Sequence, residues 1–144
     1  MKRASKQKSG SREDGSGESL TWHEVLALHG SRRGIRITKT HATLLVDFGL
    51  SLYFNEREGN RIRYEGEGKH GDQTPTGGNA GLLECLETQR PIRVFERTRP
   101  GEWFDRGEYR VISAIYRAAP EENRMIFEFT LEPMGSDTLE RNNT

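Results

Sequence analysis

The chain has 144 residues, and its 22 Lys and Arg side chains balance its 22 Asp and Glu side chains, so the formal net charge is zero. Hydrophobic residues make up only 32% of the sequence, which predicts one small, loop-rich domain with a modest core. The sequence contains no run of about 18 apolar residues, the length that spans a bilayer, and no apolar stretch typical of a signal peptide. These features argue against a membrane protein and predict a cytoplasmic one. The single cysteine, Cys85, excludes an internal disulfide.

Composition divides the chain into three parts. Residues 1–19 are rich in Gly, Ser and basic side chains and hold almost no apolar side chain, so we expect a disordered basic arm there. Residues 20–133 are expected to form the folded domain, and residues 134–144 a flexible tail. The last quarter of the chain is acidic, which offsets the basic arm in the net charge.

The first predicted element is a short helix over residues 20–29, with Ser19 or Thr21 as its N-cap and Gly30 as its end. Extended segments with alternating or β-branched side chains follow and predict three strands, over residues 36–45, 50–54 and 60–64. Between the helix and the first strand, basic residues cluster and are either phosphate contacts or a solvated surface. These residues are Arg32, Arg33, Arg36 and Lys39.

A second helix is predicted to start with Asn79 as its cap and to end near residue 87, with Cys85 packed on its buried face. Three further strands are predicted over residues 92–96, 109–116 and 125–131. Because only two helices accompany about six strands, the strands must pair mostly antiparallel. We therefore predict an α+β, mainly β fold: a strongly curved antiparallel sheet or small barrel with two helices packed against it.

The most informative segment begins at the predicted strand 60–64, which ends on the ring of Tyr64. A polar loop with five glycines follows, up to Asn79. A flat aromatic face beside a loop whose backbone can approach a ligand closely suits a planar guest such as a nucleobase. The alternative is a strand followed by an ordinary connection.

A tight hairpin over residues 55–60 would bring Asn55 next to Tyr64 on adjacent strands. An aromatic ring beside an amide is the arrangement needed to stack an extruded base and to select it by its polar edge. The alternative is that Tyr53 and Tyr64 are ordinary aromatic residues at the edge of the core.

No enzyme motif is recognisable in the sequence. The four histidines lack the spacing of a metal site, and nucleophile-elbow, P-loop and dinucleotide-binding patterns are missing, so we expect no metal and no cofactor. Glu65 and Glu67 beside the glycine-rich loop leave one enzymatic alternative, a small nucleobase-directed hydrolase. Asp72 and Gln73 are candidates for turn-capping side chains in the same loop.

Several segments together resemble an SRA (SET- and RING-associated) domain, of the kind found in bacterial modification-dependent restriction enzymes with an HNH nuclease. They are RRGIR at 32–36, LYFNEREGNRIRYEGEGKHGDQ at 52–73, GNAGLLE at 78–84, PIRVFE at 91–96 and RGEYRV at 106–111. The resemblance covers residues 20–133. It implies a PUA-like β-barrel that flips a modified cytosine out of duplex DNA.

The resemblance also implies roles for the pocket residues. Tyr64 matches the aromatic residue that stacks on the flipped base, and Glu65 and Gly66 match positions whose backbone contacts its edge. Asn55 stands where the family has an aspartate that accepts a hydrogen bond from the cytosine amine. The sequence Tyr53-Phe54-Asn55 thus departs from the family's Tyr-Asp-Asp.

The loop from Lys69 to Gly78 takes the place of the family's finger that enters the groove, with Lys69, His70 and Gln73 as DNA contacts. Phosphate contacts are implied for Arg32, Arg33 and Arg36. The sequence has no HNH or PD-(D/E)xK nuclease motif, so DNA cleavage would need a separate nuclease partner.

We predict that the chain is not an enzyme and that it reads double-stranded DNA carrying 5-methylcytosine or 5-hydroxymethylcytosine in a restriction system. Two alternatives remain besides this function. One is a PUA-like binder of RNA or modified nucleosides, and the other is the hydrolase described above. The sequence leaves open whether the chain forms a homodimer.

Overall fold

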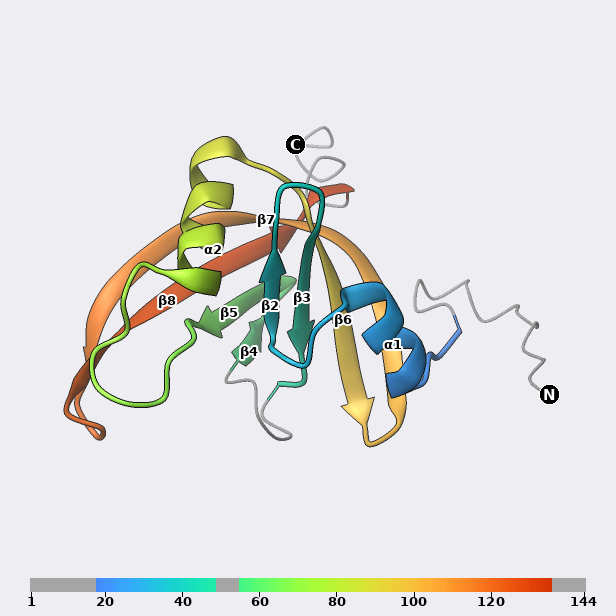
Figure 1. The fold of residues 1–144 in the computed structure, drawn as a ribbon, viewed down its shortest axis with the longest axis horizontal. Coiled ribbons are helices and arrows are strands. Elements are labelled where there is room, and N and C mark those ends of the chain that lie inside the picture. The colour runs from blue at the N-terminus through green and yellow to red at the C-terminus, as the bar shows by residue number, and fades with distance from the viewer. Residues whose placement is uncertain (1–17, 49–54, 136–144) are drawn as a thin grey trace.

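The computed structural model describes residues 18–48 and 55–135 (Figure 1). The described elements are α1 (Trp22–His29), β2 (Ile35–Ile37), β3 (Ala42–Val46), β4 (Asn55–Glu58), β5 (Arg61–Glu65), α2 (Gly77–Thr88), β6 (Ile92–Arg99), β7 (Glu102–Ala119) and β8 (Arg124–Pro133). Most of the predicted basic arm, Tyr53 with the strand predicted over 50–54, and most of the predicted tail lie outside the described residues.

The seven described strands form one sheet in the order β2-β3-β6-β7-β8-β5-β4. Only β3 and β6 pair parallel, and the five other neighbouring pairs are antiparallel. The predicted mainly β, α+β fold with two helices is therefore confirmed. The parallel pair arises because α2 lies in the connection that leads, by way of β4 and β5, from β3 to β6.

The strand predicted over residues 36–45 is in fact a hairpin of β2 and β3. Its turn is closed by a 2.7 Å hydrogen bond from the Thr38 amide to the His41 carbonyl. The turn contains no Gly, Pro, Asn or Asp, and its threonines are good strand formers, so residue alternation gave no sign of a break.

Two long strands, β7 and β8, form the curved ribbon that runs across the whole molecule (Figure 1). Gly107 has a φ of +83° within β7, and the register with β8 shifts between Val111 and Ser113. A bulge and a left-handed residue both bend a strand, which lets β7 take part in pairing along its whole length.

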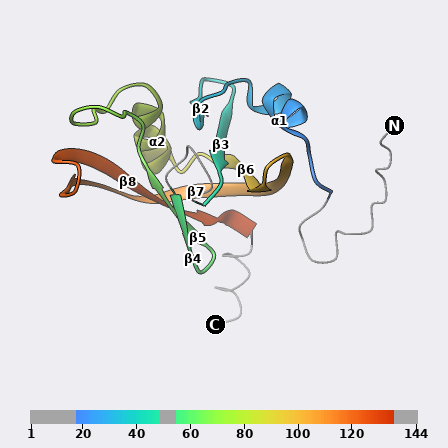
Figure 2. The same cartoon turned by 90° about the horizontal axis from the view of Figure 1, so that it is seen from below.

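Alternation of side chains along the strands creates two apolar clusters on opposite faces of the sheet. On one face, Leu44 and Val46 of β3 and Ile62 and Tyr64 of β5 pack in one cluster with residues of α2. On the other face, Leu45 packs in a cluster with residues of α1 and β7. Because β3 and β5 share the first cluster although four strand pairings separate them, the sheet must curl round α2 (Figure 2).

The structure confirms Thr21 as the cap of α1 and corrects the predicted cap of α2. In α1, the Thr21 hydroxyl accepts from the Glu24 amide and the Glu24 carboxylate accepts from the Thr21 amide, a capping box. In α2, Asn79 is not the predicted cap, because it lies two residues inside the helix that begins at Gly77. In the part of the chain that the structure describes, neither helix is long and apolar enough to cross a membrane.

Candidate nucleic-acid interface

A cavity of about 660 Å³ lies at the end of β5. We call residues 66–76, between β5 and α2, the glycine loop, and residues 31–34, between α1 and β2, the arginine turn. Both segments line the cavity, together with Tyr64 and Glu65 of β5, Asn79 of α2 and Arg124 of β8. The volume is within the range of about 300–1,000 Å³ that is typical of ligand sites.

Tyr64 lies in the wall of this cavity and also belongs to the apolar core. It is only 3% exposed and packs in one cluster with Phe127 and Phe129 of β8. The predicted hairpin is present, because Asn55 is the direct cross-strand neighbour of Tyr64. The wall of the cavity at this point is therefore a rigid part of the sheet.

Gly66 forms part of the cavity floor, where there is no space for a side chain. A Cβ atom there would lie 2.6 Å from Asn79 Oδ1, 2.6 Å from Gln73 Oε1 and 3.0 Å from Phe127 Cβ. The Gly66 amide donates to the Phe127 carbonyl at 2.8 Å, which continues the pairing of β5 with β8 beyond the end of the strand. Glycine is needed at this position for close packing, since its φ is not in the left-handed region.

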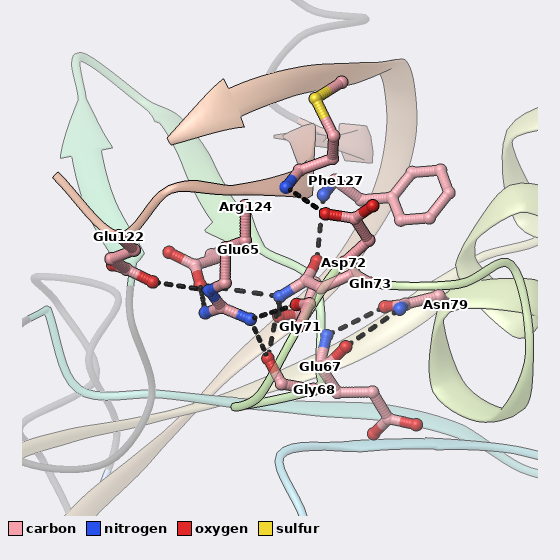
Figure 3. Close-up of polar contacts among 12 residues, drawn as sticks. Glu65, Glu67, Gly68, Gly71, Asp72, Gln73, Asn79, Glu122, Arg124 and Phe127 are labelled. Carbon is pink, nitrogen blue, oxygen red and sulfur yellow. Dashed lines mark hydrogen bonds and ion pairs between the residues drawn. The ribbon is translucent and has the colours of Figure 1, made fainter. Parts of the chain in front are cut away.

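Gln73 fixes the glycine loop against β8, as Figure 3 shows. Its Nε2 donates to the carbonyls of Gly66 at 2.7 Å and Gly68 at 3.2 Å, and its Oε1 accepts from the Phe127 amide at 2.8 Å. The residue is 2% exposed. In this structure the amide of Gln73 is buried and satisfied by the protein itself, so the predicted DNA contact would require the side chain to leave these hydrogen bonds.

Arg124, at the start of β8, supports the outer part of the same loop (Figure 3). Its guanidinium donates to the carbonyls of Gly68 at 2.7 Å and Gly71 at 3.2 Å and also pairs with Glu65 and Glu122. Sequence reasoning did not single out this arginine. It lies 56 residues from Gly68 and belongs to no local motif, so only the pairing of β5 with β8 reveals its role.

Asn79 and Glu67 join the glycine loop to the start of α2. The side-chain amide of Asn79 forms two hydrogen bonds with the backbone of Glu67. The Glu67 amide donates to Oδ1 at 2.8 Å, and Nδ2 donates to the Glu67 carbonyl at 3.0 Å. The Glu67 carboxylate accepts from the Gly78 amide at 2.7 Å and so caps the helix, where its negative charge is also favoured by the helix dipole.

Exposed basic side chains of two segments form the rim of the cavity. Arg32 and Arg33 come from the arginine turn, and Lys69 and His70 come from the glycine loop, so the structure brings four of the six predicted DNA contacts to one opening. Arg36 does not line the cavity. Its guanidinium donates to the Gly30 carbonyl at 2.6 Å and caps the end of α1.

The carboxylates that line the cavity are held by groups other than Arg33 and Lys69. Glu65 pairs with Arg124, Glu67 accepts from Gly78, and Asp72 accepts from the Met125 amide at 2.8 Å. Among the described residues, Arg33 and Lys69 form no ion pair with a carboxylate. Four Lys and Arg side chains line the cavity against three carboxylates, so a chain with zero formal net charge still presents a cationic opening.

Asn55 has a different place from the one that the resemblance implied. Its Oδ1 accepts from the amides of Asp47 and Phe48, at 3.2 and 2.5 Å, which uses both lone pairs of the oxygen. Asn55 lines a second, smaller cavity of about 280 Å³ on the other side of Glu65. In this conformation the amide oxygen holds the end of β3, so it is not available to accept a hydrogen bond from a cytosine amine.

Glu65 lies between the two cavities and lines both of them. Burial raises the pKa of its carboxyl group above the ordinary value, the nearby Glu122 raises it further, and Arg124 opposes the shift. Its carboxylate is held by Arg124 at 3.3 Å, and Glu67 is used at the start of α2. The two glutamates are thus engaged in different structural contacts.

The sheet thus curls round α2 and has a cavity with a basic rim at the end of β5. A sequence model described as "ScoMcrA-like, SRA domain" matches residues 21–143. The chain belongs to the SRA domain family. SRA domains are DNA-binding readers, and the family resemblance predicted from the sequence is confirmed. None of the curated proteins matches the chain significantly.

Solved structures have the same fold at low sequence identity. The chain aligns with the SUVH5 SRA domain in complex with fully methylated CG DNA at a TM-score of 0.70 and 20% identity, covering 83% of this chain and 88% of that one. The alignment with the SUVH5 SRA domain bound to fully hydroxymethylated CG DNA has a TM-score of 0.69 and 19% identity, and it covers 84% of this chain and 91% of that one. The alignment with the modification-dependent TagI restriction endonuclease has a TM-score of 0.69 and 22% identity, and it covers 84% of this chain and 50% of that enzyme.

Proposed function

We propose that this domain reads double-stranded DNA that carries a 5-substituted cytosine, 5-methylcytosine or 5-hydroxymethylcytosine, by flipping the base into the cavity at the end of β5. The observation that carries the proposal is the cavity itself, which combines an aromatic wall, a glycine floor and a basic rim. The SRA relatives solved with methylated and hydroxymethylated CG DNA support the choice of ligand.

In this proposal Tyr64 stacks on the flipped base, and the backbone of Glu65 and Gly66 contacts the base edge. Base stacking on an aromatic ring contributes about 1–3 kcal/mol. Tyr53 is the second aromatic residue proposed for the pocket, and Asn55 contributes indirectly by holding the end of β3 near the pocket. Arg32, Arg33, Lys69 and His70 would contact phosphates, which fix position without reading sequence.

The test compares binding to three duplexes that differ in one base: cytosine, 5-methylcytosine or 5-hydroxymethylcytosine. Fluorescence anisotropy should give tighter binding to a modified duplex, with a difference of about 1–3 kcal/mol. Tyr64→Leu should remove the preference, because leucine fills a similar apolar space without a π-face. Leucine is a better probe than alanine, since Tyr64 is part of the core. Equal affinities for all three duplexes would refute the proposal.

We also propose that the chain does not cut DNA by itself and works with a separate nuclease. The structural engagement of Glu65 and Glu67 supports a binding role. Modified DNA incubated with the purified chain should remain intact, with no base released. Strand breaks or free base would instead support the hydrolase alternative. Competition by single-stranded RNA or by free modified nucleosides, stronger than by unmodified duplex DNA, would support the RNA-binding alternative.

A further inference from the structure

His29, the last residue of α1, is fully buried and contacts the arginine turn directly. Its Nε2 lies 2.6 Å from the Arg33 carbonyl oxygen, and its Nδ1 faces the Thr43 hydroxyl of β3. The Thr43 oxygen also lies 3.1 Å from Nε2 of His41. His29 belongs to no metal or catalytic motif, so no role for it was predictable from the sequence.

The partners of the ring fix which nitrogen carries the proton. A carbonyl oxygen can only accept, so Nε2 of His29 must carry the hydrogen that it donates to Arg33. Nδ1 of the neutral ring is then an acceptor, and the Thr43 hydroxyl donates to it. The Thr43 oxygen in turn accepts from His41. Burial lowers the pKa of His29, which agrees with a neutral ring.

The rest of the arginine turn is held at its two ends. The Leu45 amide of β3 donates to the Gly34 carbonyl at 2.8 Å, and the Arg33 amide donates to the Ser31 hydroxyl at 3.0 Å. His29 supplies the contact in the middle, at the carbonyl of the residue whose side chain stands on the cavity rim. Without it, the Arg33 carbonyl would lose the hydrogen bond that fixes its direction.

We propose that His29 is a positioning residue for DNA binding: its donated hydrogen bond fixes the arginine turn so that Arg33 meets a DNA phosphate at the cavity rim. This inference rests on the proposed function, since it assigns Arg33 to a phosphate. Preorganisation of a rim cation removes part of the entropy cost of forming the contact. The imidazole acts through the backbone of Arg33 and does not touch DNA.

The test uses the matched variants His29→Gln and His29→Asn in the full chain. Glutamine places an amide N–H near the position of Nε2 and keeps the bond to Arg33, whereas asparagine is too short and reaches only the side of Thr43. Affinity for duplexes with cytosine or 5-methylcytosine is measured from about 50 to about 200 mM salt. Each phosphate contact contributes about 0.9 to the slope of log affinity against log salt.

We expect His29→Asn to lower this slope by about 1, as Arg33→Ala does, and to weaken binding to both duplexes equally. His29→Gln should keep the wild-type slope. The double variant His29→Asn with Arg33→Ala should have the slope of Arg33→Ala alone. If His29→Asn does not fold, His29→Leu replaces it, and failure of both to fold assigns His29 to stability alone and overturns the proposal.

An unchanged slope in His29→Asn, or additive losses in the double variant, would also overturn the inference. Failure of the proposed function gives a different result, because the wild-type chain would then bind both duplexes equally. The comparison of slopes would still decide whether His29 acts through Arg33.

Discussion

The floor and the rim of the cavity are built in opposite ways. The floor residues Gly66, Gln73 and Asn79 are buried, and their contacts are internal to the protein. The rim residues Arg33 and Lys69 are exposed and form no ion pair within the described part of the chain. Substitutions in the floor should therefore lower both the free energy of unfolding and the affinity for DNA, whereas substitutions in the rim should lower the affinity for DNA alone.

The largest effect is expected for Gly66→Ala. The added methyl group would meet two buried side-chain oxygens and Phe127, so it must displace hydrogen-bond acceptors as well as overpack the floor. We expect a loss of about 2–4 kcal/mol in the free energy of unfolding, measured by urea denaturation. Gly135→Ala is the matched control, because a Cβ there meets nothing within 4 Å, and it should be nearly neutral.

Gln73→Glu should be the next most harmful change. It replaces the NH₂ group that donates to the carbonyls of Gly66 and Gly68 with a carboxylate oxygen. This oxygen is repelled by the two carbonyl oxygens and by the nearby Glu65 carboxylate. We expect a loss of about 2–3 kcal/mol at neutral pH and weaker binding to every duplex. Gln89→Glu tests the contrast, since Gln89 also donates to two carbonyls but is exposed. A loss of similar size there would show that burial is not the cause.

Lys69→Ala probes the rim. We expect the free energy of unfolding to change by less than about 0.5 kcal/mol. The slope of log affinity against log salt should fall by about 1. Arg117→Ala is the control on the outer face of the sheet, where that arginine already pairs with Glu128 at 3.1 Å. It should leave the slope unchanged. The distinction between rim and outer face fails if both variants lower the slope alike.

The smallest expected effect is a dependence of stability on pH through His29. Burial, followed by the charges of His41 and Arg36, lowers the pKa of His29 in the folded state. Below the unfolded pKa of about 6.5, the unfolded chain binds a proton that the folded chain does not, so stability falls as pH decreases from there. His29→Gln should flatten this part of a melting-temperature profile. An identical profile in both proteins would rule out His29 as the cause.

Local patterns in the sequence determined much of the architecture. The helix predicted over 20–29 is α1, within two residues, because a capping residue and a glycine end mark it. The strand ending on Tyr64 and its pairing with Asn55 also follow from alternation and a short turn. The basic rim was partly predictable too, since Arg32 and Arg33 are neighbours in the sequence and so are Lys69 and His70.

The tertiary structure alone decided which polar groups remain for a ligand. Gln73, Asn55 and Arg36 looked available in the sequence, yet each is used by backbone groups of another segment. Such partners lie up to 54 residues away, as Phe127 does from Gln73, so no local pattern encodes them. Local residue chemistry thus determined the two helices, most of the strands and the position of the charges, whereas the curl of the sheet determined which of those groups can meet DNA.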